Sequence, residues 1–200
     1  MTMYGYVICE YEKVRQWMPE FAASMAQLKN DLIAKASADW DPLKYGGMAP
    51  QSGQFGESTV IPGLFNGMHA AYQPLPTWYQ TFNGTGHQTI MTGTGTGGIM
   101  REDYKVGLAG LVFLSKAIRI SEIRMQIGDR KIPRINIEEA MVYNKPAIVF
   151  EQPMILDEEE GFSLYAYVLT RGEQRIKLLG LQMNRIPNKL QVTNTGVALT

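Results

Sequence analysis

The chain has 200 residues, of which 45% are hydrophobic and 19% charged, a composition typical of one globular domain or of a domain with an appendage. Its 19 basic and 19 acidic residues balance, so we do not expect overall charge to draw it to nucleic acid. The single cysteine, Cys9, excludes an intrachain disulfide and a cysteine-rich zinc site. The longest apolar run, residues 106–114, is too short to span a membrane, and the N-terminus lacks the order of a signal peptide. We therefore expect a soluble protein made in the cytoplasm.

Charged residues are distributed unevenly along the chain. None lies between Ser58 and Met100, whereas the segments before and after carry many. Because such a change in composition usually marks a boundary, we expect three parts. These are an N-terminal segment over residues 1–44, a Gly/Thr/Pro-rich zone over residues 45–100, and a body with a C-terminal tail over residues 101–200.

The N-terminal segment carries a helical pattern. Its apolar side chains recur three and four residues apart, at Tyr11, Val14, Met18, Phe21, Met25, Leu28 and Leu32. Proline fits the first turn of a helix and not its interior, so the pattern predicts an amphipathic helix from about residue 19 to residue 38, ended by Asp41-Pro42. Such a helix packs either on its own domain or against a neighbouring subunit. Residues 4–9 are expected to form a short strand.

The Gly/Thr/Pro-rich zone includes a run of threonine and glycine at residues 92–98. It also holds more aromatic side chains than a disordered linker normally carries, so we predict an extended but ordered arm or set of loops. The cores of protein interfaces are depleted in charge and enriched in aromatic residues. We therefore assign an assembly interface to five of these side chains: Phe65, Tyr72, Trp78, Tyr79 and Phe82. The alternatives are an arm that lies across its own domain and a zone that contributes strands to the body.

The body carries a strand pattern. Expected strands, most of them separated by turns, cover residues 104–114, 117–127, 131–137, 147–150, 162–170 and 174–183, and the tail holds a weaker candidate at 190–193. The apolar alternation slips at Ser121-Glu122, which indicates a β-bulge, and Gly128-Asp129 supplies a turn. No helical crossover separates these strands, so we predict an antiparallel sandwich or barrel.

The chemical motifs are weak. Gly93, Gly95 and Gly98 match a dinucleotide fingerprint in spacing, but a strand pattern follows them where a helix is required. His69 and His87 have no carboxylate near them in the sequence. We therefore predict no catalytic residue, no cofactor and no metal site. An enzyme would need a pocket in which a carboxylate such as Glu138 meets His87.

The body has adjacent charged segments of opposite sign. Five basic residues lie between Arg119 and Arg134, and seven acidic residues lie between Glu138 and Glu160. Such patches either pair within a monomer or permit head-to-tail contacts between subunits. We extend the predicted interface to these patches, through Arg119, Arg124, Arg130, Arg134, Asp157, Glu158 and Glu159.

The segments 158–168 and 174–180 resemble the closing hairpin of viral jelly-roll coat proteins, and the hairpin over residues 118–137 and the Gly/Thr-rich zone are also similar to such proteins. The resemblance covers about half of the chain. It implies a mainly β fold, an antiparallel β-sandwich of jelly-roll type with an N-terminal amphipathic α-helix and a long Gly/Thr/Pro-rich arm. It further implies a shell subunit of an icosahedral bacterial or archaeal virus, made in the host cytoplasm and located in the virion, without cofactor or catalytic residues.

The expected function is therefore structural. As a capsid subunit, the chain would have copies of itself and other capsid proteins as partners. It lacks the basic terminal arm of nucleic-acid-binding coat proteins, so we expect no strong nucleic-acid binding, and contact with an internal viral membrane stays open. The alternative is a monomeric β-sandwich binding module that recognises a carbohydrate or a protein through Trp78, Tyr79 and Phe82.

Overall fold

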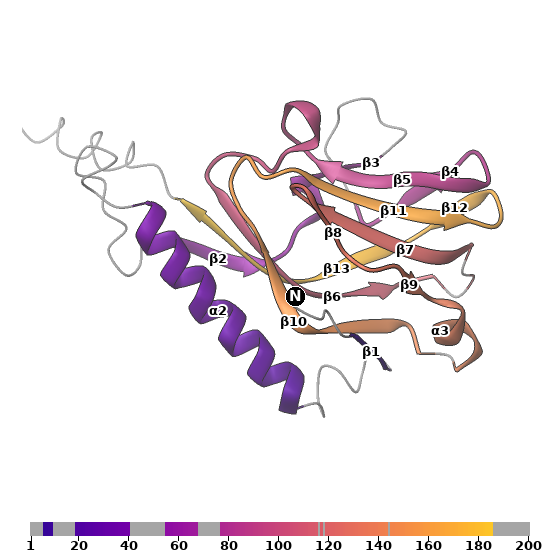
Figure 1. The fold of residues 1–200 in the computed structure, drawn as a ribbon, viewed down its shortest axis with the longest axis horizontal. Helices are drawn as coiled ribbons and strands as arrows, with labels where there is room; N and C mark the ends of the chain where they lie inside the picture. The colour runs from indigo at the N-terminus through magenta and orange to yellow at the C-terminus, as the bar shows by residue number, and fades with distance from the viewer. Residues whose placement is uncertain are drawn as a thin grey trace, which may run out of the picture.

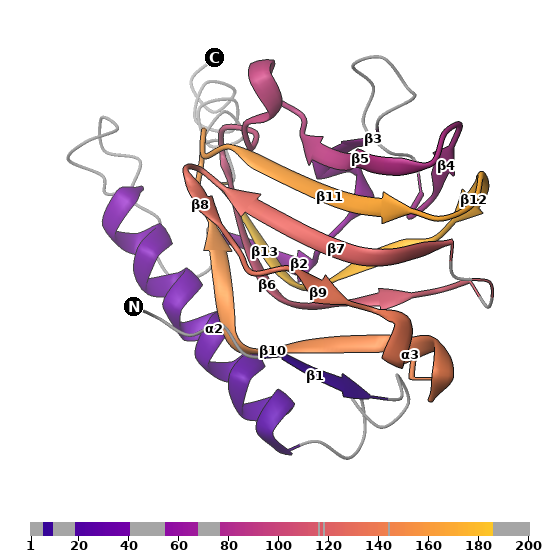
Figure 2. The ribbon, with the colours of Figure 1, turned by 45° about the vertical axis from the view of Figure 1, so that its right-hand side comes forward.

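The computed structural model describes residues 6–9, 19–40, 55–67, 77–115, 117, 119–143 and 145–185. Two antiparallel sheets face each other, and one long helix lies on the outside of the first sheet (Figures 1 and 2). The predicted mainly β, antiparallel fold with an N-terminal helix is thus confirmed. No helix in the described part is long and apolar enough to cross a membrane.

The strands form two large sheets and a small one. In the first sheet the order is β1 (Tyr6–Cys9), β10 (Ala147–Leu156), β6 (Tyr104–Phe113), β13 (Ile176–Arg185) and β2 (Phe55–Thr59). In the second it is β3 (Phe65–Gly67), β5 (Gly86–Gly93), β11 (Phe162–Val168), β7 (Ile120–Ile127) and β8 (Arg130–Lys131), with β9 (Ile135–Asn136) also paired to β7. A third sheet joins β4 (Gln80–Phe82) to β12 (Gly172–Gln174). The short helices are η1 (Pro62–Leu64), η2 (Thr96–Gly98) and α3 (Glu138–Val142).

The strands pair in a nested order. Strand β2 pairs with β13, β5 with β11, β6 with β10, and β7 with β9, so early strands pair with late ones as in one long hairpin. Two further pairs, β13·β6 and β11·β7, each place a late strand beside an early strand from another level of this hairpin. Each sheet therefore combines strands that are distant in the sequence.

The core lies between the two sheets and follows the predicted alternation. On β11 the buried side chains are Phe162, Leu164, Ala166 and Val168, as expected. On β7 the predicted bulge is confirmed, because Tyr167 pairs with Glu122 while the next residue, Val168, pairs with Ile120 and leaves Ser121 over. The extra residue changes the alternation, so Ile120 and Ile123 both face the core.

Strand β10 is longer than predicted. The sequence suggested residues 147–150, but the strand continues to Leu156 through Pro153, and its register on β6 shifts between Val149 and Met154. Proline has no N–H to donate to the hydrogen-bond ladder, so a proline within a run argues against a strand. For this reason the sequence did not predict the second half of β10. Pro133 has a similar effect in the predicted strand over residues 131–137, which is divided into β8 and β9. The weaker candidate at 190–193 lies outside the described residues.

The Gly/Thr/Pro-rich zone contributes strands β2, β3, β4 and β5, the alternative that the sequence left open. Within it, Gly93 lies so close to Ile99 that a Cβ atom at residue 93 would be 2.1 Å from the Ile99 carbonyl oxygen. The backbone N–H of Gly95 also donates to that oxygen over 2.9 Å. The threonine–glycine run is therefore a tight loop at the end of β5.

Helix α2 (Pro19–Asp39) matches the predicted helix and packs on its own domain. Its buried side chains Leu28, Leu32 and Ala36 cluster with Ala109 and Met183 of the first sheet. The first part of the predicted stripe, Tyr11, Val14 and Met18, lies outside the described residues. The helix thus covers the outer face of the first sheet (Figure 2).

Candidate functional site

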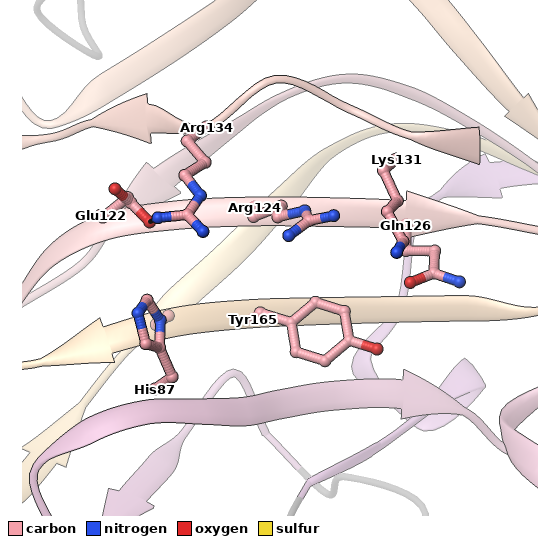
Figure 3. A pocket seen from close by; sticks show the side chains of 8 residues that line it. His87, Glu122, Arg124, Gln126, Lys131, Arg134 and Tyr165 are labelled. Carbon is pink, nitrogen blue, oxygen red and sulfur yellow. Dashed lines mark ion pairs between the residues drawn. The ribbon is translucent and has the colours of Figure 1, made fainter. Parts of the chain in front are cut away.

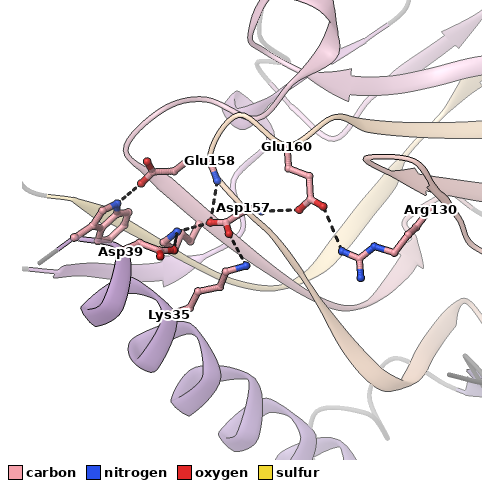
Figure 4. Close-up of polar contacts among 8 residues, drawn as sticks. Lys35, Asp39, Arg130, Asp157, Glu158 and Glu160 are labelled. Atoms are coloured by element: carbon pink, nitrogen blue, oxygen red, sulfur yellow. Dashed lines mark hydrogen bonds and ion pairs between the residues drawn. The ribbon is translucent and has the colours of Figure 1, made fainter. Parts of the chain in front are cut away.

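A buried ionic cluster joins the end of α2 to the first sheet. Lys105, on β6, is only 1% exposed, and its ammonium group donates to Asp39 over 2.7 Å and also to Asp157. Lys35 forms a second ion pair with Asp157 (Figure 4). The ammonium of Lys105 also lies 5.4 Å from the centre of the Trp40 ring, within cation–π range.

The ionisation of this cluster favours a structural role. Burial alone would lower the pKa of Lys105, but the hydrogen bonds to Asp157 and Asp39 outweigh burial and raise it. Burial alone would raise the pKa of Asp157, but the hydrogen bonds from Lys105 and Lys35 hold it below its ordinary value. Both groups are therefore charged at neutral pH, which suits a fixed ion pair better than proton transfer.

The acidic run is engaged within the chain, and its place at a subunit interface stays a prediction. Asp157 bonds Lys105 and Lys35, Glu158 accepts a hydrogen bond from the Trp40 indole, and Glu160 pairs with Arg130 over 3.3 Å. Burial raises the pKa of Glu158, although the Trp40 bond opposes this shift. Of the three predicted acidic side chains, Glu159 alone is exposed.

The side chains of the predicted aromatic interface differ in exposure. Phe65 is 0% and Phe82 2% exposed, and both belong to the core between the sheets, so neither is available to a partner. Trp78 is partly buried, and its ring centre lies 6.1 Å from that of Phe65. A hydrogen bond to Glu173 on β12 raises the pKa of the half-buried Tyr79. Tyr72 lies outside the described residues.

The predicted basic residues do not all share one surface. Arg119 donates to the carbonyl oxygen of Arg171 over 2.6 Å, and Arg130 pairs with Glu160. The other two, Arg124 and Arg134, meet on the outer face of the second sheet. Together with Lys131 they line a depression of about 290 Å³. In Figure 3, Arg124 extends from β7, and Lys131 and Arg134 reach toward it from the segment that begins with β8. Tyr165 on β11 and His87 on β5 line the other edge of the depression. We call this surface the basic depression; its other lining residues are Glu122, Gln126 and Ala166.

The sheet register places these side chains. Ile123 and Met125 of β7 are buried, so Arg124 between them points to the outer face, where it pairs across strands with Tyr165. Lys131 of β8 lies opposite Gln126. The sequence indicated the charges, but only the turn at Gly128 and the β7–β8 pairing bring residues 124 and 131 to one surface.

The basic depression carries a net positive charge. Among its described lining residues the one carboxylate, Glu122, forms an ion pair with Arg134 over 3.3 Å. Within the described residues, Arg124 and Lys131 have no carboxylate within ion-pair distance. The half-buried Arg124 and the exposed Lys131 are therefore electrostatically suited to meet acidic groups from another molecule.

The sequence-based enzyme alternative is not assembled in the described part of the chain. His87 lines the basic depression, where the carboxylate is Glu122 and not Glu138, and its ring meets the edge of Tyr167 at 4.9 Å. Among the described residues, no three His, Cys, Asp or Glu side chains are grouped to hold a metal ion. His69 is not among them.

Comparison with known proteins adds no relative. No family model, curated protein or solved structure matches the chain. The fold and its surfaces are therefore the basis for function, and the basic depression is the candidate site that remains accessible.

Proposed function

We propose that the chain is a viral capsid subunit, a structural protein that assembles with copies of itself through a jelly-roll β-sandwich. The nested strand pairing carries this proposal. A jelly roll is a long antiparallel hairpin rolled into two interleaved Greek keys, a form used by capsid domains, lectins and cupins. The pairs β2·β13, β5·β11, β6·β10 and β7·β9 are the rungs of such a hairpin, and β13·β6 and β11·β7 are the contacts that rolling adds.

The interior supports a structural subunit over a cupin. A cupin binds its metal through side chains inside the barrel, whereas the space between these sheets is filled by apolar side chains such as Met125, Leu164 and Ile176. His87 is on the outer face of β5 beside Tyr167. The described interior is thus built for packing.

The aromatic side chains weigh against the binding module. A sugar-stacking platform needs exposed rings, but Phe82 is in the core and Trp78 packs against it. The exposed large apolar side chains lie elsewhere, on α3 and at strand ends, and include Val142, Tyr143, Leu114 and Leu169. Scattered over several edges, they do not form one continuous platform for a ligand.

In this role the protein would reside in the virion, with copies of itself and other capsid proteins as partners. The test is light scattering after size exclusion, over a range of protein concentrations at low and high salt, with negative-stain images of any large fraction. We expect shells, rings or tubes that high salt weakens, because charged surfaces contribute to the contacts. A monomer under every condition contradicts the proposal.

A further inference from the structure

Helix α3 presents an acidic and apolar surface to solvent. Its backbone is held in place from the inside, because Ile137 is 0% and Ala140 2% exposed. The side chain of Asn136 accepts a hydrogen bond from the N–H of Glu138 over 2.8 Å and caps the first turn. This short helix is therefore fixed on the body by packing and by its cap.

The outward side chains of α3 and the residue after it are largely open to solvent, and the one described contact among them is the Lys145 ammonium, 5.8 Å from the centre of the Tyr143 ring. Val142 is 78% and Tyr143 63% exposed, the two largest exposures among the large apolar side chains that the structure describes. Glu138 and Glu139 are exposed as well, and neither lies within ion-pair distance of a described cation. We call these four side chains the α3 knob. Apolar residues beside a charged rim are the composition of a protein contact.

The basic depression has the complementary chemistry. It is concave and positively charged, with Arg124 and Lys131 free of described carboxylates, and it offers the rings of Tyr165 and His87 to an apolar side chain. The acidic run cannot supply its partner, since Asp157, Glu158 and Glu160 are bonded within the chain. Glu138 and Glu139 are the exposed acidic pair of the described residues that adjoins exposed apolar side chains.

We propose that the α3 knob of one copy docks in the basic depression of a second copy. Glu138 and Glu139 then face Arg124 and Lys131, while Val142 and Tyr143 are removed from water against the outer face of the second sheet. This inference rests on the proposed function, because it names the surfaces through which the subunits meet. Opposite charge gives the contact its specificity, and the apolar pair adds burial.

Two charge-reversal variants test the contact. The first carries Arg124→Glu and Lys131→Glu, and the second carries Glu138→Lys and Glu139→Lys. In each variant alone, knob and depression have the same sign, so we expect self-association to weaken by about tenfold or more. In an equimolar mixture every knob meets a depression of opposite sign, so association should return to near the wild-type level. Sedimentation velocity at low salt measures the associated fraction.

A third variant controls for overall charge. Arg171→Glu with Arg175→Glu changes two exposed residues elsewhere and has the same net charge as the first variant. It should self-associate like the wild type, because its knob and its depression are both unchanged. Thermal unfolding of all three variants checks that each is folded.

The outcomes separate the two proposals. Wild-type assembly that neither reversal weakens, a mixture that associates no better than either reversal variant alone, or a control variant that loses association as the first variant does, overturns the contact and leaves the proposed function standing. A wild-type chain that stays monomeric contradicts the proposed function, whereas selective association of the first two variants in that case still supports the contact.

Discussion

Lys105 and Asp157 form an ion pair between the second residue of β6 and the first residue after β10, at the point where α2 ends. The ammonium group is almost fully enclosed, and the backbone N–H of Asp157 in turn donates to Glu160 over 3.0 Å. This pair therefore connects the helix, the first sheet and the β10–β11 loop through a single buried charge.

Replacing Lys105 should destabilise the fold strongly. Lys105→Ala leaves Asp39 and Asp157 facing each other without their shared cation, and we expect a loss of about 2 to 4 kcal/mol, discounted for the partial exposure of both carboxylates. Lys29→Ala is the control, because Lys29 pairs with Glu57 over 2.7 Å at an exposed site, where the loss should stay below about 1 kcal/mol. Urea unfolding of both variants measures the difference. Equal losses would contradict a special role for the buried pair.

Asp157 should make the folded state sensitive to acid. Its pKa in the folded protein lies below the ordinary value of 3.8, so its contribution is complete above that value and is lost as pH falls through the lower folded pKa. Unfolding free energies measured between pH 2 and pH 7 should therefore fall at the acid end. Asp157→Asn should flatten that decline, and an unchanged slope in the variant would contradict the assignment.

Glu158 should act with the opposite sign. Burial raises its pKa above the ordinary value of 4.5, so the folded state holds the proton more tightly than the unfolded state. Stability from this group is present below 4.5 and is lost as pH rises through the raised folded pKa. Glu158→Gln should remove this loss, so the stability of the variant relative to wild type should increase from pH 4 to pH 7. The same urea series measures it.

Gly107 should be required for the approach of α2. A Cβ atom there would lie 2.5 Å from Cδ1 of Leu28, so Gly107→Ala forces the leucine or the helix to move, at about 1 to 3 kcal/mol. Gly63→Ala is the control, because no atom lies within 4 Å of the added carbon. Combined with Leu28→Ala, the Gly107 substitution should cost less than it does alone. Strict additivity in this double-mutant cycle would argue against the contact.

Leu164 and Leu169 allow the same substitution inside and outside the core. Leu164 is fully buried on β11, and Leu164→Ala should cost about 2 to 5 kcal/mol. Leu169 is 45% exposed, and Leu169→Ala should cost less than about 1 kcal/mol. Chemical denaturation of the two variants compares them directly, and a small loss at Leu164 would contradict its place between the sheets.

Local patterns were enough to predict much of the fold. The spacing of Leu28 and Leu32 predicted α2, and the phase slip at Ser121 predicted a bulge that the pairing of β7 with β11 confirms. In each case the pattern lies within one element and needs no knowledge of the partner.

Strand β5 could not be predicted in the same way. Its register on β11 passes from Met91 to Thr89 and omits Ile90, so Ile90 and Met91 are both buried and the alternation is lost. The Gly- and Thr-rich sequence around them is typical of loops. Pairing with a complete β11, more than 70 residues later, makes this segment a strand.

The candidate site was predicted only in part. The sequence indicated both charged segments, and Arg130 of one pairs with Glu160 of the other, but it did not indicate that Asp157 meets Lys105 and Lys35, which are far from it along the chain. Lys105 gave no signal either, since a lysine near the start of an apolar strand usually lies at the surface. Its burial depends on carboxylates 66 and 52 residues away.

The nested pairing also determines when the domain can close during synthesis. Strand β13 is the last strand in the described chain, yet it lies between β6 and β2 in the first sheet. Until residues 176–185 have left the ribosome, the edges of β6 and β2 that they will join have no partner. Strands β7, β8 and β9, in contrast, are close enough in sequence to pair early. Contacts between distant segments form slowly and unpaired edges favour aggregation, so we expect the nascent chain to be most prone to aggregate before β13 is complete.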